Sequence, residues 1–224
     1  MKEQNTHQTT ENKEKLTEIV FILDRSGSMS GFEGDTVGGF NSTIERQKEN
    51  DGKAFVSTVL FDNESEVIHD RVDIENIKPL TRKEFYVRGC TALYDAIGDA
   101  IHHIGNIHKY ARKEDVPEST IFVIITDGME NASHKYTKSQ IKAEIERQKE
   151  KYGWEFIFLG ANIDSKETAD SIGIKEAVDY CQDKDGFKAT YASVNFAISS
   201  VRKNSTLCAD WCVEVDKDNL RRKK

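Results

Sequence analysis

The stretch IVFILDRSGSMSG, residues Ile19–Gly31, decides the fold of this chain. Five apolar residues, Ile19–Leu23, run without a break and stop at an aspartate, which is followed by two serines spaced by one residue. An apolar run that ends abruptly at a polar loop is typical of a strand buried on both faces, as in a parallel sheet. The same pattern recurs at Ser119–Ile125, where the run ends on the Thr126–Gly128 turn. Two buried strands are therefore predicted.

The rest of the chain alternates between helical and strand patterns. Strands that alternate with helices imply right-handed crossovers and a mainly parallel sheet covered on both faces. Asp62–Ser65 is short enough to join two consecutive strands as an antiparallel hairpin, which puts one strand at the sheet edge. The sequence therefore predicts a doubly wound α/β fold with one antiparallel edge strand. The first strand is expected at Thr17–Leu23, further strands at Ala54–Phe61, Glu66–Val72, Trp154–Gly160 and Ala177–Cys181, and helices at Asp35–Asn50, Leu93 to about Tyr110, Thr137–Lys151, Ser165–Ile172 and Gly186–Lys203.

In such sheets, functional residues gather at the carboxyl ends of the strands, because every strand-to-helix loop opens there. Asp24, Ser26 and Ser28 lie just past one predicted strand, and Asp127 lies just past another. The predicted fold therefore brings these four residues to the same end of the sheet, where the strands have their carboxyl ends.

Nucleophilic and phosphoryl chemistry fit this edge poorly. A hydrolase nucleophile elbow needs a serine at the centre of Gly-x-Ser-x-Gly, but Met29 stands at the centre of Gly27–Gly31. A phosphate-binding loop needs a lysine after its second glycine, and Phe40 follows the glycine pair spaced as Gly34–Gly39. An aspartyl phosphate at Asp24 calls for a second acid two residues on, where a serine stands.

A metal site fits better. Hydroxyl and carboxylate oxygens without Cys or His are hard ligands, suited to magnesium, manganese or calcium and poorly suited to zinc. Asp24, Ser26 and Ser28 supply one acid and two hydroxyls from a single loop, and Thr91 and Asp127 arrive from neighbouring loops. Taken alone, an Asp-x-Ser-x-Ser stretch is more typical of a helix N-cap and turn than of a metal site.

Three segments together resemble a von Willebrand factor type A (VWA) domain. They are Asp24–Ser28 after a strand, Gly89–Leu93 before a helix and Ile125–Gly128 after a strand, and the resemblance covers about residues 17–203. In this order they match the three parts of the family's metal-ion-dependent adhesion site, or MIDAS. The resemblance implies a Rossmann-like fold.

The resemblance also implies roles for the five residues. Ser26 and Ser28 would be direct hydroxyl ligands and Thr91 a direct or water-mediated one, while Asp24 and Asp127 would hold the metal mostly through water and orient the serines. The expected cofactor is Mg²⁺ or Mn²⁺, with Ca²⁺ also compatible. Cys90 stands where relatives frequently have glycine, which would make the loop stiffer or redox-sensitive.

The implied function is metal-dependent protein binding. Neutral hydroxyls quench little of the ion's charge, so one exchangeable position stays open for an Asp or Glu carboxylate of a partner protein. A regulatory subunit of a cytosolic chelatase-like ATPase or of a stress-response assembly would use the same docking chemistry. Metal-assisted hydrolysis is disfavoured, because no general base accompanies the predicted ligands, and we expect no enzymatic activity.

Composition bounds the remaining possibilities. The formal charge of −7 disfavours nucleic acid and anionic membranes as partners. No apolar run approaches the roughly 20 residues that span a bilayer, no secretory signal pattern begins the chain, and four scattered cysteines agree with a reducing compartment, so a cytoplasmic location is expected. Residues 1–16 are predicted to be a disordered polar tail, residues 17–203 the domain, and residues 204–224 an extension with a solvated basic end. The oligomeric state is left open.

Overall fold

The computed structural model describes residues 15–223, and its centre is the strand that the opening apolar run predicts. β1 (Leu16–Asp24) is buried from its second residue to its last. It pairs in parallel with β2 (Lys53–Phe61) on one side and with β4 (Ser119–Thr126) on the other. A strand with parallel neighbours on both sides and helices on both faces meets no solvent, which explains its unbroken apolar sequence.

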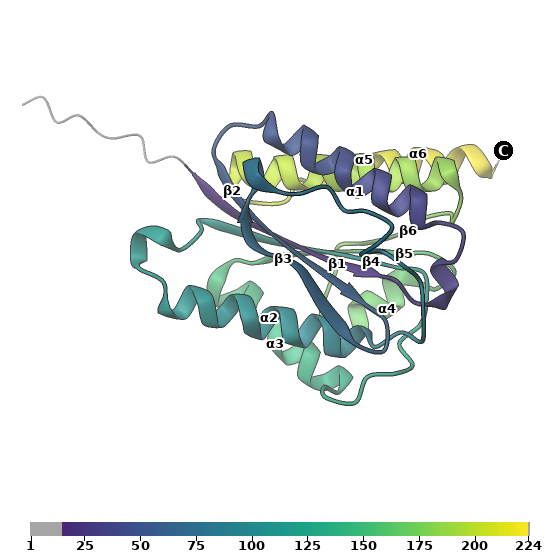
Figure 1. The fold of residues 1–224 in the computed structure, drawn as a ribbon, viewed down its shortest axis with the longest axis horizontal. Helices are drawn as coiled ribbons and strands as arrows, with labels where there is room; N and C mark the ends of the chain where they lie inside the picture. The colour runs from purple at the N-terminus through teal and green to yellow at the C-terminus, as the bar shows by residue number, and fades with distance from the viewer. Residues whose placement is uncertain (1–14, 224) are drawn as a thin grey trace, which may run out of the picture.

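The sheet has six strands in the order β3-β2-β1-β4-β5-β6 (Figure 1). β5 (Glu155–Gly160) and β6 (Ala177–Asp179) extend the parallel arrangement. β3 (Ser65–Asp73) is antiparallel to β2 and forms one edge. The predicted doubly wound sheet with one antiparallel edge strand is confirmed.

Helices cover both faces of the sheet. α1 (Glu33–Lys48), α5 (Lys184–Asn204) and α6 (Val213–Arg222) lie on one face, and α2 (Leu93–Tyr110), α3 (Lys138–Tyr152) and α4 (Ser165–Ser171) lie on the other (Figure 1). Successive side chains of a strand point to opposite faces. In β1, Phe21 therefore packs in the core under α1 and α5, whereas Ile22 packs in the core under α2 and α3.

The end of the chain differs from the prediction. Residues 213–222 form α6, which packs on α5; Val215 of this helix and Trp211, just before it, are buried in the core. Arg221 forms an ion pair with Asp218, and Arg222 forms one with the same aspartate. Arg222 also pairs with Asp183 at 2.6 Å. Both arginines are exposed, and their ion pairs with acids one helical turn away and at the start of α5 are a feature that the sequence analysis did not predict.

Other predictions concern the first residues, the cysteines and membranes. The predicted tail lies outside the described residues up to residue 14, and Leu16, assigned to that tail, begins β1. All four cysteines are free thiols, so Cys208 and Cys212 form no disulfide. Over residues 15–223, no helix has the length and apolar character needed to cross a membrane.

Candidate metal centre

The loops at the carboxyl ends of β1 and β4 bring the predicted acids and hydroxyls together. Ser26 precedes a short 3-10 turn, Gly27–Met29, that carries Ser28. The hydroxyl oxygens of Ser26 and Ser28 lie 3.0 Å apart. The Ser28 hydroxyl donates a hydrogen bond of 2.6 Å to Oδ1 of Asp127, which follows β4. Residues 99 positions apart in the sequence thus meet at one point.

Thr91 joins this cluster from the loop that precedes α2. A Cβ atom placed on Gly128 would lie 3.0 Å from the Thr91 hydroxyl and 3.4 Å from the Ser28 hydroxyl. The two hydroxyls therefore flank the same glycine, and a side chain there would press on both. The absence of a side chain at Gly128 keeps the space between the hydroxyls free.

Asp24 lies beneath the hydroxyls and fixes the start of the loop. Its Oδ1 accepts from the backbone N–H of Ser26 at 2.7 Å, and its Oδ2 accepts from the Thr126 hydroxyl at 2.6 Å. Burial raises the pKa of Asp24 to about 6, against the opposing effect of these hydrogen bonds, and the nearby Asp127 raises it further. Burial also raises the pKa of Asp127, although Ser28 and Gln182 donate to it. Both carboxylates are thus short of compensating positive charge.

The donor set fits a hard divalent cation. The structure brings together two carboxylates and three hydroxyls, all of them oxygen donors, from the five predicted residues Asp24, Ser26, Ser28, Thr91 and Asp127. Over residues 15–223, no group of three or more His, Cys, Asp or Glu side chains is placed to hold a metal ion. A site here therefore depends on serine and threonine oxygens, which suit magnesium and manganese better than zinc.

A buried ion-pair network, which the sequence analysis missed, supports the first loop. Arg25 stands between Asp24 and Ser26 in the sequence, and its side chain is fully buried. Its Nε lies 2.8 Å from Asp62 Oδ2, and Arg88 Nε lies at the same distance from the same oxygen. Burial raises the pKa of Asp62, but hydrogen bonds from Arg88, the Glu64 backbone and Arg25 outweigh it and hold the value below the usual range. Asp62 thus joins the loop after β1 to the loop that carries Thr91.

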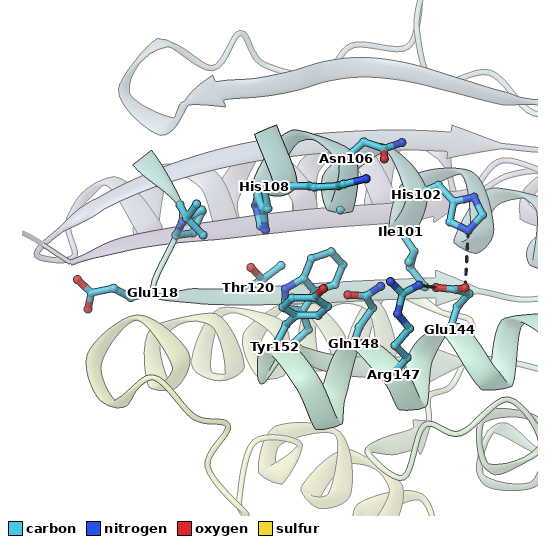
Figure 2. A pocket seen from close by; sticks show the side chains of 15 residues that line it. Ile101, His102, Asn106, His108, Glu118, Thr120, Glu144, Arg147, Gln148 and Tyr152 are labelled. Atoms are coloured by element: carbon cyan, nitrogen blue, oxygen red, sulfur yellow. Dashed lines mark hydrogen bonds and ion pairs between the residues drawn. The ribbon is translucent and has the colours of Figure 1, made fainter. Parts of the chain in front are cut away.

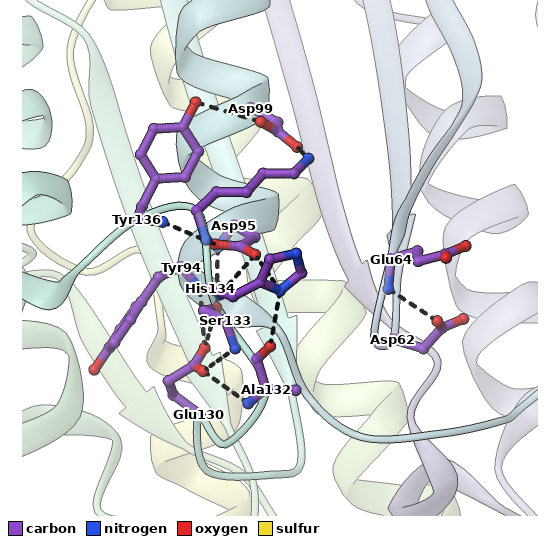
Figure 3. A network of polar contacts seen from close by, with 11 residues as sticks. Asp62, Glu64, Tyr94, Asp95, Asp99, Glu130, Ala132, Ser133, His134 and Tyr136 are labelled. Atoms are coloured by element: carbon purple, nitrogen blue, oxygen red, sulfur yellow. Dashed lines mark hydrogen bonds and ion pairs between the residues drawn. The ribbon is translucent and has the colours of Figure 1, made fainter.

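The loop after β4 is tied to the first turn of α2 (Figure 3). Thr91 and Asn131 exchange two hydrogen bonds, one from the Asn131 backbone N–H to the Thr91 carbonyl at 3.0 Å and one from the Thr91 N–H to Asn131 Oδ1 at 2.9 Å. Asp95 accepts backbone N–H groups of three successive residues at 3.0, 2.9 and 3.0 Å, and these residues are His134, Lys135 and Tyr136. An acid in the first turn of a helix is expected from the sequence, because it stabilises the helix N-terminus. That pattern does not predict that Asp95 binds the loop after β4.

Gln182, between β6 and α5, is a further neighbour that the sequence analysis missed. Its side-chain amide donates to Asp127 Oδ2 and, at 3.3 Å, to the backbone carbonyl of Ser28. Its own oxygen accepts a hydrogen bond of 2.7 Å from Asn162. Two amides in series therefore fix the second carboxylate oxygen of Asp127, and no local sequence pattern marks either of them.

Cys90 directly precedes Thr91 in the loop before α2. Its side chain is exposed, and its backbone N–H donates to Asn63 Oδ1 at 2.8 Å. The preceding Gly89 has a φ of 67°, and a Cβ there would collide with the same Asn63 oxygen. The loop that carries Thr91 is thus held by Asn63 and Asp62 from the turn between β2 and β3.

No protein-family model and no curated protein matches this chain. Solved structures match its fold. A von Willebrand factor type A protein from Catenulispora acidiphila superposes with a TM-score of 0.56 at 13% identity, covering 84% of this chain and 43% of that one. Proximal thread matrix protein 1 from the mussel byssus gives 0.53 at 15% identity, covering 81% and 45%. The ArnB paralogue VWA2 from Sulfolobus acidocaldarius gives 0.52 at 16%, covering 82% and 45%.

The chain spans less than half the length of each of these structures. A further structure of the mussel protein, with a TM-score of 0.52 at 16% identity over 81% of this chain and 45% of that one, is described as having a zinc-occupied MIDAS motif. At these identities the likeness concerns the fold. Together with the strand order and the antiparallel edge strand, it shows that this chain has the Rossmann-like fold of von Willebrand factor type A domains.

Proposed function

We propose that this chain is a metal-dependent protein-binding module, in which a divalent cation held by Ser26, Ser28 and Thr91 receives an Asp or Glu carboxylate of a partner protein. The observation that carries the proposal is the meeting of three hydroxyls and two carboxylates at the open edge of the sheet. Ser28 is exposed, so this cluster faces the surface, where a partner docks.

The hydrogen-bond directions suit this role. Because the Ser28 hydroxyl donates its proton to Asp127, it accepts from the Ser26 hydroxyl 3.0 Å away and keeps one lone pair to face a cation. Asp24 engages Ser26 twice, because its carboxylate accepts from the Ser26 backbone N–H and also interacts with the Ser26 hydroxyl. The acids thus orient the hydroxyls, and the neutral hydroxyls leave most of the ion's charge available. When bound, the cation supplies an electrophilic position for an acidic side chain.

Binding is a better proposal than hydrolysis. Oxygens of Asp24 accept from Ser26 and Thr126, and oxygens of Asp127 accept from Ser28 and Gln182, so both carboxylates already have structural partners. A general base must be free to take a proton from the attacking water, whereas these two carboxylates are needed to orient the hydroxyls around the cation. We therefore propose that the chain is not an enzyme, and that Mg²⁺ or Mn²⁺ is its cation.

Affinity capture from a lysate of the source tests the proposal. The immobilised chain is expected to retain its partner in saturating Mg²⁺ and to release it in EDTA. Ser28→Ala removes a hydroxyl ligand and is expected to abolish capture, whereas the control Ser171→Ala, which removes a hydroxyl bonded only within α4, is expected to leave it unchanged. Capture that persists in EDTA or in Ser28→Ala would overturn the proposal. The captured protein also tells whether the chain serves a larger ATPase or stress-response assembly.

A further inference from the structure

A cleft of about 480 Å³ opens between α2 and α3 (Figure 2). It lies at the amino ends of the strands, opposite to the candidate metal centre. Thr120, near the start of β4, and Trp154, just before β5, form its floor. Clefts of this volume hold small molecules in many proteins. Because the metal centre lies at the carboxyl ends of the strands and the cleft at their amino ends, the two sites are separate.

The floor of the cleft is aromatic. The Trp154 ring stacks on Phe122 with centroids 5.2 Å apart, and His108 meets its edge at 5.5 Å. Above it, α2 carries Gly105, where an added Cβ would lie 3.9 Å from the indole. That is ordinary contact, whereas a Cβ at Gly98 on the same helix would meet the ring of Tyr136 at 2.6 Å. Glycine is unfavourable within a helix, and at Gly105 no clash requires it. Its effect is to keep α2 free of a side chain beside this edge of the indole.

Polar groups without partners surround this floor. Gln148 is 5% exposed and Thr120 is 3% exposed, and neither side chain makes a hydrogen bond within residues 15–223, although neither polar group is among the fully buried, unpartnered ones. The indole N–H of Trp154, a residue 5% exposed, likewise has no acceptor in the described part of the chain. Figure 2 shows the Gln148 side chain rising from α3 into the cleft and Thr120 at its floor. These polar atoms therefore face the cleft, where a ligand can replace water as their hydrogen-bond partner.

The histidine at the cleft is held in place from below. His108 Nε2 lies 3.4 Å from Glu18 Oε2, and Glu18 is fully buried against Arg71, whose Nε lies 2.7 Å away. The ring of His108 is thus oriented by a buried ion pair from β1 and β3. A floor that is fixed in this way needs little rearrangement to accept a rigid, flat molecule.

The charged groups at the rim add a preference. Lys109 on α2 forms no ion pair among the described residues, and Arg147 on α3 lies 3.3 Å from Glu144. Glu144 is already engaged, because His102 approaches it from the other wall at 4.0 Å. Glu118 points away from the cleft in Figure 2. Arg147 and Glu144 pair with each other, so Lys109, whose ammonium lies over the Tyr110 ring, is the rim cation that an anionic substituent can approach.

We propose that the cleft between α2 and α3 binds a planar nitrogen heterocycle of nucleotide size that carries an anionic group. The ring lies along Trp154, its polar edge bonds to Gln148 and Thr120, and the anion lies toward Lys109. A heterocycle supplies both donors and acceptors in one plane, which matches an amide, a hydroxyl and an indole N–H around an aromatic floor.

Nuclear magnetic resonance of the two indole N–H groups tests this inference. The probe is adenosine 5′-monophosphate, compared with adenosine, which lacks the anion, and with ribose 5-phosphate, which lacks the ring. We expect the shift of the Trp154 resonance to titrate with a Kd several-fold lower for the monophosphate than for adenosine. The Trp211 resonance is the internal control, because its N–H donates to Glu176 on the far side of the sheet. Ribose 5-phosphate is expected to shift neither.

Two variants test whether the probe binds in the cleft. Gly105→Leu places a side chain beside this edge of the indole, and Gln148→Leu removes the amide, so each is expected to weaken the response at least tenfold. Gly38→Leu is the matched control, since Gly38 on α1 faces open space. The inference is overturned if neither adenosine nor its monophosphate shifts the Trp154 resonance at millimolar concentration. It is also overturned if ribose 5-phosphate shifts that resonance as the monophosphate does, or if the monophosphate shifts it equally in Gln148→Leu and in the unaltered chain. The titration uses no metal, so its outcome does not depend on whether the chain binds a cation.

Discussion

Replacing Asp24 by asparagine separates the stability of the metal-free chain from its affinity for a cation. The side chain is 1% exposed and accepts hydrogen bonds from the Ser26 backbone and the Thr126 hydroxyl. Asparagine has the same shape, its oxygen still accepts the Ser26 N–H, and the Thr126 hydroxyl turns to accept from the new amide. The substitution therefore removes the charge and leaves the packing in place.

The magnitude follows from the burial of the carboxylate. Burial raises the pKa of Asp24 from its ordinary 3.8 to about 6, which corresponds to about 3 kcal/mol between its two protonation states. A raised pKa stabilises the fold fully below 3.8, and this contribution is lost as the pH rises through about 6. At neutral pH without metal the wild type has lost all of it. Subtracting about 1 kcal/mol for weaker hydrogen bonds, we expect Asp24→Asn to be more stable by about 2 kcal/mol.

Urea unfolding in EDTA and in Mg²⁺ is the assay. In EDTA, the advantage of Asp24→Asn is expected to shrink as the pH falls from neutral toward 3.8, because the wild-type carboxyl then becomes neutral as well. At a Mg²⁺ concentration 100 times its Kd, the wild type gains about 2.7 kcal/mol, and the variant gains much less. Asp164→Asn is the control, since this aspartate caps α4 and asparagine caps a helix equally well.

The reasoning is refuted if Asp24→Asn is less stable than the wild type in EDTA at neutral pH, or if Mg²⁺ stabilises both chains equally. The first outcome would mean that the hydrogen bonds to the carboxylate outweigh its burial. The second would mean that the cation, if bound, does not depend on Asp24.

Three further measurements test neighbouring parts of the structure. Gln182→Ala removes the amide that orients Asp127, so Mg²⁺ affinity by calorimetry is expected to fall about 10–100-fold, and an unchanged affinity would show that the amide is dispensable. Burial lowers the pKa of His69, so the free energy of unfolding is expected to fall as the pH drops below 6.5; His69→Gln should flatten this fall, and an equal fall in the variant contradicts it. Hydrogen exchange over residues 186–203 is expected to be the same with and without a carboxylate partner in Mg²⁺, and altered protection there would indicate that α5 moves.

The sequence by itself determined the layers of this protein and the five residues of the candidate metal centre. β1 and β4 are apolar on both faces, so their runs predict buried strands without reference to any other segment. Asp24, Ser26 and Ser28 follow one run and Asp127 follows the other, and parallel strands bring such loops to one edge whatever the details of packing. These predictions rest on local patterns, which the sequence displays directly.

Only the tertiary structure decided what holds and surrounds that centre. Arg25 and Asp62 are 37 positions apart, and Gln182 and Asp127 are 55 positions apart, so no spacing rule connects them. An arginine or a glutamine in a loop is usually solvated, and only the folded chain shows that one is buried in an ion pair and the other bonded to a carboxylate. α6 was missed for the same reason. Its charged sequence gives little apolar signal, and it is stable on α5 because Trp211 and Val215 are buried there and acids elsewhere pair with its arginines.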